Sequence, residues 1–216
     1  MNFPTGETNK YSQYDDLQGN PDTLKSNGAT MSQLLVNSSL SLQLAGVTKT
    51  ATVFQNTYSN GTAMDSDFYS QDANKDLYKV DFGLEPLNNN AAIVNFMGGK
   101  AHVGWVLMSK LASPAGATWK AIDQVLHTTG QLGDITLLDN ATMQADTTFS
   151  FNGKAYYTKH VHHSFSASAA LGSAQGEYDI YTAPSIGANV IYWVHPISSS
   201  AGSQNGIQNV LTEHTP

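Results

Sequence analysis

The sequence contains no cysteine, and all ten of its basic residues are lysines, so arginine is absent as well. Without cysteine the chain can form no disulfide, no thiolate nucleophile and no cysteine-ligated zinc site. Charged residues make up only 12% of the 216 residues, so serine, threonine, asparagine and glutamine must supply the polar surface. This composition favours an extracellular or cell-surface protein over the alternatives, a cytosolic protein or a virion component.

Basic clusters and long apolar runs are also missing. With a formal net charge of -7 and no basic run, the chain is poorly suited to bind nucleic acid or an anionic membrane surface. No apolar run approaches the ~20 residues that a membrane-spanning helix needs, so we expect no membrane insertion. The first ten residues, MNFPTGETNK, hold no apolar signal region, so Met1 is either native or added to a mature secreted chain.

A β-hairpin is predicted at residues 147–163, TTFSFNGKAYYTKHVHH. Two runs of β-favouring residues flank an Asn-Gly dipeptide, which accepts positive φ at both central positions of a tight turn. In a two-residue turn Phe149 faces Tyr156, and alternation puts this pair with Phe151 on one face, which we expect to be core. The later residues alternate too, with His160 and His162 on this face and Tyr157, Val161 and His163 on the other.

The chain as a whole is predicted to be all-β, mainly an antiparallel sandwich or barrel. About ten short runs of strand character are separated by turn signals, as in such folds. One short helix is expected near residues 117–127, where Trp119, Ile122, Val125 and Leu126 fall at helical spacing. This helix would cap one end of the sandwich or barrel.

Three segments follow from the composition along the chain. Residues 1–30 are polar and broken by glycine and proline, so we expect an extended N-terminal arm or linker. Residues 31–197 form the β domain, which is either one unit or two modules divided near residue 112. Residues 198–216 begin with SSSAGSQNG and are expected to be a flexible C-terminal tail.

Three fragments resemble the small wall-binding β modules of Gram-positive surface proteins, the GW-type and related Src-homology-like modules. Residues 98–111, GGKAHVGWVLMSKL, are similar to a closing strand, residues 151–165 to the equivalent hairpin of a sister module, and residues 177–184 to an opening strand. Their order along the chain departs from that of the family. The resemblance implies a non-catalytic domain that contacts wall polymers through exposed aromatics, with Trp105 and Tyr157 in the matching positions.

An incomplete calcium motif lies in the acidic stretch at residues 64–76. Asp72, Asn74 and Asp76 alternate as the oxygen ligands of a calcium loop do. Leu77 and Gly83, however, occupy the positions where such loops need glycine and a bidentate glutamate. The sequence therefore leaves two interpretations open, a Ca²⁺ site and a solvated polar loop.

The histidines at residues 160, 162 and 163 are the densest group of reactive side chains. On a strand, His160 and His162 point the same way and can bind one transition metal, provided that another strand supplies a third ligand. The candidates for that ligand are His102, His127 and His195. The alternatives are a polar strand end without metal and a cluster that gains charge below about pH 6.

Aromatic residues concentrate in the C-terminal half and suggest a platform for stacking on sugar rings. The candidates for ligand binding are Tyr157, Trp105, Trp193 and Tyr192, although aromatics also favour strand interiors. Of these, Tyr157 is the best exposed candidate, because Tyr156 and Tyr157 must point to opposite faces of the hairpin.

Three functions remain open at this stage. The first is a non-catalytic surface or adhesion domain that binds glycan or cell-wall polymer. The second is a structural subunit of a virion, tail or filament, in which copies of the chain assemble by strand addition. The third is a metal-dependent hydrolase that uses the histidines. No nucleophile elbow, phosphate loop or dinucleotide fingerprint is present, so an enzyme is the less favoured class and no catalytic residue is assigned.

Overall fold

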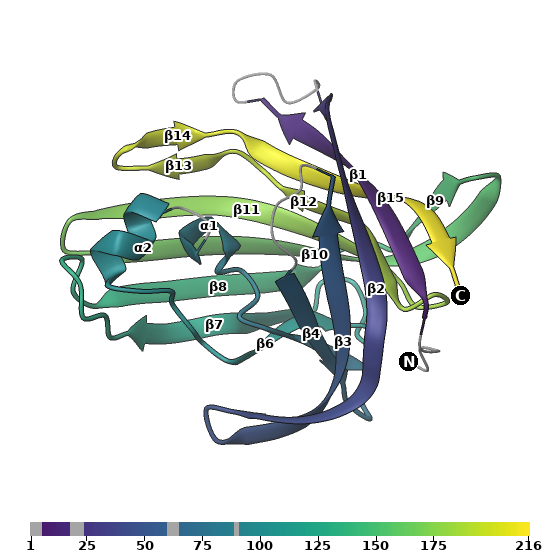
Figure 1. Ribbon diagram of the computed structural model, residues 1–216, viewed down its shortest axis with the longest axis horizontal. Helices are drawn as coiled ribbons and strands as arrows, with labels where there is room; N and C mark the ends of the chain where they lie inside the picture. Colours follow the sequence, from purple (N-terminus) through teal and green to yellow (C-terminus); the bar gives the residue numbers. More distant parts are fainter. Residues whose placement is uncertain (1–5, 18–23, 60–64, 89–90) are drawn as a thin grey trace.

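The computed structural model describes residues 6–17, 24–59, 65–88 and 91–216, and it contains one antiparallel sheet of 15 strands. The sheet order is β6-β5-β4-β3-β2-β1-β15-β12-β11-β10-β8-β7, with β9, β13 and β14 attached at its side. The sheet curls into a nearly closed barrel, as Figure 1 shows. This confirms the predicted all-β class.

The strands of the N-terminal half are β1 (Thr8–Asp16), β2 (Leu24–Leu44), β3 (Val47–Tyr58), β4 (Asp65–Gln71), β5 (Asp76–Val80) and β6 (Trp105–Lys110). Those of the C-terminal half are β7 (Thr118–Leu126), β8 (Ile135–Met143), β9 (Thr147–Phe151), β10 (Lys154–Ala169), β11 (Gly172–Ala183), β12 (Ala188–Val194), β13 (Ile197–Ser199), β14 (Gly202–Gln204) and β15 (Gly206–Thr215). Two helices, α1 (Glu85–Asn88) and α2 (Ala91–Met97), follow β5. Among the described residues, no helix has the length and apolar character needed to cross a membrane.

The two halves of the chain meet at β1 and β15, which pair along their whole length. At the opposite side, β6 and β7 end the two branches of the sheet. Trp119 of β7 nevertheless contacts β6, because its indole Nε1 donates a hydrogen bond to the carbonyl oxygen of Leu107 at 2.9 Å. Residue 112, where the sequence suggested a division into two modules, lies in the connection between β6 and β7, and that division stays a prediction.

The helix predicted at residues 117–127 is wrong, since this segment is strand β7. It pairs with β8 from Thr118 to Leu126, and a bulge between Lys120 and Ile122 shifts the alternation of side chains. The bulge explains the error, because one extra residue turns a period of two into a spacing that resembles a helix. The helices that do form, α1 and α2, pack against the barrel interior through Leu87, Ile93, Val94 and Met97.

The predicted N-terminal arm and C-terminal tail are also wrong where the structure describes them. Tyr11 in β1 and Leu211 in β15 are buried in the same apolar cluster. Each of the two strands pairs on both sides, so they lie in the middle of the sheet. Backbone hydrogen bonds on both sides and a few buried apolar side chains are enough to order these two strands, although their composition is mostly polar. Residues 1–5 and 18–23 of the expected arm lie outside the described residues.

Among the described residues, the buried apolar side chains form three clusters. The main cluster fills the barrel and includes Phe82, Met108 and Ile180. In the second cluster, the β9–β10 hairpin packs Phe149, Phe151 and Tyr156 against residues of β11, β12 and β15. The third and smallest cluster consists of Ala141, Met143 and Val161. The predicted hairpin register is confirmed, with Phe149 opposite Tyr156, and so is the prediction that this face is core.

Gly206, at the start of β15, lies close to the backbone of residues 194–196, where β12 ends. A Cβ atom at this position would lie 2.1 Å from the Val194 carbonyl oxygen and 2.7 Å from the His195 carbonyl carbon. We expect Gly206→Ala to lower the free energy of unfolding by about 1–3 kcal/mol, because backbone atoms must move to accept the methyl group. Urea denaturation measures this. Ser203→Ala on exposed β14 is the control, and an equal loss in both variants would contradict the close-approach argument.

Candidate functional site

Strand alternation places two sets of polar side chains back to back on β10 and β11. His160 and His162 point to the outer face of the sheet, whereas His163 points into the barrel. On β11, Tyr178 is buried in the barrel core, and Asp179 faces outward, opposite His162 in the ladder. Consecutive residues therefore serve two separate clusters, one on each face of the sheet.

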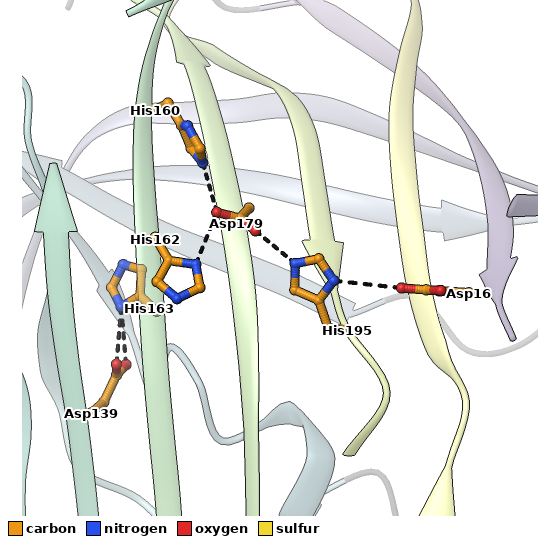
Figure 2. Close-up of polar contacts among 7 residues, drawn as sticks. All are labelled: Asp16, Asp139, His160, His162, His163, Asp179 and His195. Carbon is orange, nitrogen blue, oxygen red and sulfur yellow. Dashed lines mark hydrogen bonds and ion pairs between the residues drawn. The ribbon is translucent and has the colours of Figure 1, made fainter. Parts of the chain in front are cut away.

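The outer cluster consists of Asp16, His160, His162, Asp179 and His195 (Figure 2). Asp179 is its centre. Its Oδ1 atom accepts hydrogen bonds from His160 Nε2 at 2.6 Å and from His162 Nδ1 at 3.1 Å, and its Oδ2 atom accepts one from His195 Nε2 at 2.6 Å. One carboxylate thus holds three imidazoles from β10 and from the end of β12.

His195 lies between two carboxylates. Its Nε2 bonds to Asp179, and its Nδ1 lies 3.5 Å from Oδ2 of Asp16 at the end of β1. The same oxygen of Asp16 accepts a hydrogen bond from the Trp193 indole at 2.8 Å. Because both ring nitrogens of His195 face acceptors, the doubly protonated ring fits this position best.

The pKa values follow from this arrangement. Burial raises the pKa of Asp179, but the hydrogen bonds from His160 and His195 outweigh it and hold that pKa well below its usual range. Burial lowers the pKa of His195, but the hydrogen bond to Asp179 and the charges of Asp179 and Asp16 raise it overall. At neutral pH, Asp179 is therefore ionised, and His195 gains its proton more readily than an exposed histidine does.

Aromatic rings hold the outer cluster in place and leave part of it accessible. The His160 ring stacks on Tyr181 at 4.1 Å between centroids, and the His195 ring lies 4.4 Å from that of Trp193. His162 is the most accessible of the three imidazoles. Among the described residues, His160 Nδ1 and His162 Nε2 make no hydrogen bond to the protein, so both nitrogens can meet a ligand.

The inner pair, His163 and Asp139, is buried in the barrel, with side chains 0% and 2% exposed. His163 Nδ1 lies 3.0 Å from Asp139 Oδ1, and its Nε2 donates to the carbonyl oxygen of Met108 at 3.0 Å. The Tyr178 hydroxyl donates to Asp139, and the Tyr178 ring stacks on His163 at 4.5 Å. Burial, and then the charge of Asp139, raises the pKa of Tyr178 well above its ordinary value.

The structure brings together His160, His162 and His195, three of the residues considered for a transition metal. They surround the carboxylate of Asp179, which was not among the residues predicted from the sequence. His102 and His127 lie elsewhere, each beside its own aspartate. In the part of the chain that the structure describes, no group of three or more His, Cys, Asp or Glu residues is arranged to hold a metal ion. A metal on these histidines stays a prediction.

The calcium candidates form the turn between β4 and β5. Asp72 Oδ1 accepts hydrogen bonds from the backbone N–H groups of Asn74 at 2.9 Å and Asp76 at 3.0 Å. Lys75 has a positive φ of 63°, as tight turns require. The Asp72 carboxylate therefore already has a structural role as a turn acceptor, and calcium binding stays a prediction.

The four aromatic candidates for ligand binding do not share one surface. Tyr192 lies against the main core, beside Phe82, whereas Trp193 lies on the outer face and bonds to Asp16. Trp105 is half-buried on β6. Tyr157 is 51% exposed on the β10 part of the hairpin, where its hydroxyl bonds to Asp146.

A third polar group, the lysine cluster, lies inside the barrel and joins Lys79 of β5 to Asp67 of β4 and Glu85 of α1. Lys79 Nζ lies 3.0 Å from Asp67 Oδ1 and 3.1 Å from Glu85 Oε1. Burial lowers the pKa of Lys79, but the charges of Asp67 and Glu85 and the adjacent Tyr69 raise it well above its ordinary value.

Asp179, Asp16, Asp139 and the lysine cluster were not predicted from the sequence. A usable signal was present for Asp179, because it stands between Tyr178 and Ile180 in a run with a period of two. An acidic residue at the polar position of such a run faces away from the core. Its partner across the sheet depends on the pairing of β10 with β11, which no local pattern shows.

No protein-family model and no curated protein matches this chain. Two solved structures are similar to it over nearly their whole length. One is a Bacteroides fragilis protein with a YmcC-like fold, provisionally classed as exported, with a TM-score of 0.53 and 10% identity over 99% of this chain and 97% of its own. The other is a Parabacteroides distasonis protein provisionally classed as a lipoprotein, with a TM-score of 0.56 and 10% identity over 98% of this chain and 96% of its own.

At this identity the likeness establishes the fold alone, and the chain shares the YmcC-like fold. These structures are not the small wall-binding modules that three of its fragments resemble. That resemblance stays a prediction.

Proposed function

We propose that this protein is exported, stands at the cell surface, and binds a glycan or wall polymer there without catalysis. The binding surface in this proposal is the outer cluster, with His160 and His162 as the contact residues. Trp193 and Tyr181 fix the rings of the cluster.

Two observations support the location. The composition is that of a secreted protein, poor in charge and without cysteine or arginine. The two similar structures, whose fold this chain shares, belong to proteins provisionally classed as exported or as a lipoprotein. Secretion of the native gene product, followed by cell fractionation, tests this part of the proposal directly.

The main support for the binding proposal is that one ring nitrogen each of His160 and His162 has no protein partner among the described residues on the outer face. Asp179 binds one nitrogen of each imidazole, which fixes the rings and leaves His160 Nδ1 and His162 Nε2 for hydroxyl or carboxylate oxygens. A rigid polar site of this kind loses little entropy when an extended polymer binds. Sugar hydroxyls both donate and accept hydrogen bonds, so they suit imidazole in either tautomer.

Tyr157 supplies a second contact on the neighbouring hairpin. The hydrogen bond of its hydroxyl to Asp146 fixes the half-exposed ring, and Asp146 also pairs with Lys159 at 2.8 Å. A fixed aromatic ring beside a charged pair is suited to stack on a sugar while polar groups meet the hydroxyls. By strand alternation Tyr157 and His162 point to opposite faces of β10, so Tyr157 would contact a polymer separately from the outer cluster.

We expect His162→Ala to weaken glycan binding by about tenfold, which corresponds to one lost hydrogen-bonding contact of about 1.4 kcal/mol. A glycan array identifies the ligand, and calorimetry measures the affinity of the variant. His127→Ala is the matched control, because His127 is an exposed histidine that also pairs with an aspartate, at 3.0 Å, but lies outside the cluster.

Three results would count against this proposal. Equal weakening in the two variants would place the binding surface elsewhere. One equivalent of copurified metal that is lost in His160→Ala would favour the metal-dependent hydrolase. Stable assemblies in light scattering would favour self-assembly, although Lys120, Asp123 and the bulge in β7 protect that end of the sheet against strand addition.

A further inference from the structure

The lysine cluster has the arrangement of a reaction centre as well as that of an ion pair. Lys79 Nζ lies 3.0 Å from one oxygen of the Asp67 carboxyl group, so the amine is in direct contact with the group that it would attack. The Lys79 and Asp67 side chains are only 14% and 17% exposed. Both side chains therefore sit in a site that excludes most water.

The second oxygen of Asp67 is held by two amide groups. Asp67 Oδ2 accepts hydrogen bonds from Gln33 Nε2 at 3.2 Å and from Asn56 Nδ2 at 3.0 Å. Gln33 and Asn56 are themselves buried. Two fixed donors on one carboxyl oxygen polarise that group and stabilise the negative charge that develops there when a nucleophile adds to its carbon.

Glu85 completes the set. Its Oε1 atom lies 3.1 Å from Lys79 Nζ, and its Oε2 atom is buried without a hydrogen-bond partner among the described residues. A carboxylate that touches the amine with one oxygen and has the other free can take a proton from the nitrogen and deliver it to a leaving oxygen.

We propose that Lys79 and Asp67 condense to form an intramolecular isopeptide bond, with Glu85 as the general acid and base and with Gln33 and Asn56 as oxyanion donors. This proposal does not depend on the proposed glycan-binding function. It assigns a covalent modification to the interior of the barrel, in a chain that has no cysteine to form a disulfide.

The reaction balances without any co-reactant. The Lys79 ammonium first passes one proton to Asp67, which gives a neutral amine and a neutral carboxylic acid. The amine nitrogen then adds to the Asp67 carboxyl carbon, and Oδ2 carries the negative charge against the two amide donors. Glu85 takes the second proton from nitrogen and returns it to Oδ1, which leaves as water when the C–O bond breaks and the amide forms.

The first step, proton transfer from the Lys79 ammonium to Asp67, works against the charges that stabilise the ammonium and is therefore the step that limits the reaction. The ring centroids of Tyr69 and Phe82 lie 5.8 and 5.7 Å from Lys79 Nζ, so these rings limit the access of water to the amine. Asp67 and Glu85 stabilise the ammonium, and proton transfer to the directly bonded Asp67 removes one of these charges with the proton. A neutral acid and amine also need less solvation than an ion pair in a buried site.

The product would lock β4 to β5 next to the open side of the barrel. Tyr69 of β4 faces Lys79 of β5 in the ladder, and Asp67 is the next residue on the same side of β4. The two strands lie directly before β6, which ends this branch of the sheet. The covalent bond would secure the branch that lacks a continuous ladder to β7.

Mass spectrometry tests this proposal with the full chain as purified. We expect the denatured protein to be lighter than its sequence mass by one water. After trypsin digestion, residues 50–75 should be joined to residues 76–100, because an acylated Lys79 is not cleaved. The full sequence mass in the folded protein, or a water loss located at another residue, would overturn the proposal.

Three variants separate the reaction from a simple ion pair. Lys79→Arg keeps the cation but lacks the nucleophilic amine, so it should have its full sequence mass. Glu85→Gln should lower the cross-linked fraction at least tenfold, whereas Lys110→Arg, the control on β6, should retain the water loss. An unchanged water loss in folded Lys79→Arg would overturn the proposal. If that variant fails to fold, the wild-type peptide map decides alone.

Discussion

Asp139→Ala lowers the free energy of unfolding by about 3–5 kcal/mol, the loss expected when one partner of a buried ion pair is removed. The change leaves the His163 ring without its carboxylate and the Tyr178 hydroxyl without its acceptor. Neither group can turn to water, because His163 is fully buried and Tyr178 nearly so. Urea denaturation, followed by tryptophan fluorescence and circular dichroism, measures this loss.

Asp134→Ala is the matched control. Asp134 also pairs with a histidine, His127, and the distance of 3.0 Å is the same as in the inner pair. It differs in burial, since the side chains of His127 and Asp134 are 81% and 59% exposed. We expect a change within about 0.5 kcal/mol. Similar losses in the two variants would contradict the argument that burial makes the inner pair important.

The second large effect is the pH dependence of stability in Asp179→Asn. In the wild type, the lowered pKa of Asp179 contributes stability that is full above the unfolded value of about 3.9 and is lost as the pH falls toward its folded pKa. The raised pKa of His195 contributes stability that is full below about 6.5 and is lost as the pH rises through its folded pKa. Both contributions are therefore complete between about pH 4 and pH 6.5.

In this window we expect Asp179→Asn to lose about 2–3 kcal/mol, the value of a hydrogen bond to a charged group. The difference from the wild type should shrink above pH 6.5 and below pH 4, because the wild type loses its own contributions there. Urea denaturation at a series of pH values measures both proteins. A difference that does not vary with pH would show that the charge of Asp179 is not the cause, and Asp123→Asn at an exposed site is the control.

The same polar clusters explain why the fold accepts charged side chains in unusual places. Each buried charge has a partner from a different strand or helix, such as Asp139 of β8 for His163 of β10. Unpaired, such a charge would disfavour folding by several kcal/mol. The barrel interior therefore stays folded only if β4, β5, β8, β10 and α1 take their correct places together.

Local patterns were sufficient for the hairpin and for the orientation of its histidines. An Asn-Gly turn specifies two residues between β9 and β10, and strand alternation then determines that His160 and His162 share a face while His163 lies on the other. The same patterns failed at residues 117–127, because the bulge in β7 breaks the period of two. Local patterns also failed at both ends of the chain, where the polar composition suggested an arm and a tail. There β1 and β15 are stabilised by pairing with each other and with β2 and β12.

The all-β class, the absence of disulfides and the two faces of the hairpin follow from residue types and their spacing, because turn geometry and side-chain alternation act over a few residues. The outer cluster, the inner pair and the lysine cluster do not. Each joins residues far apart in the chain, such as Asp16 and His195, and their contact depends on strand order and register. Those are decided by the pairing of the whole sheet, in which β1 meets β15 and closes the two halves of the chain into one barrel.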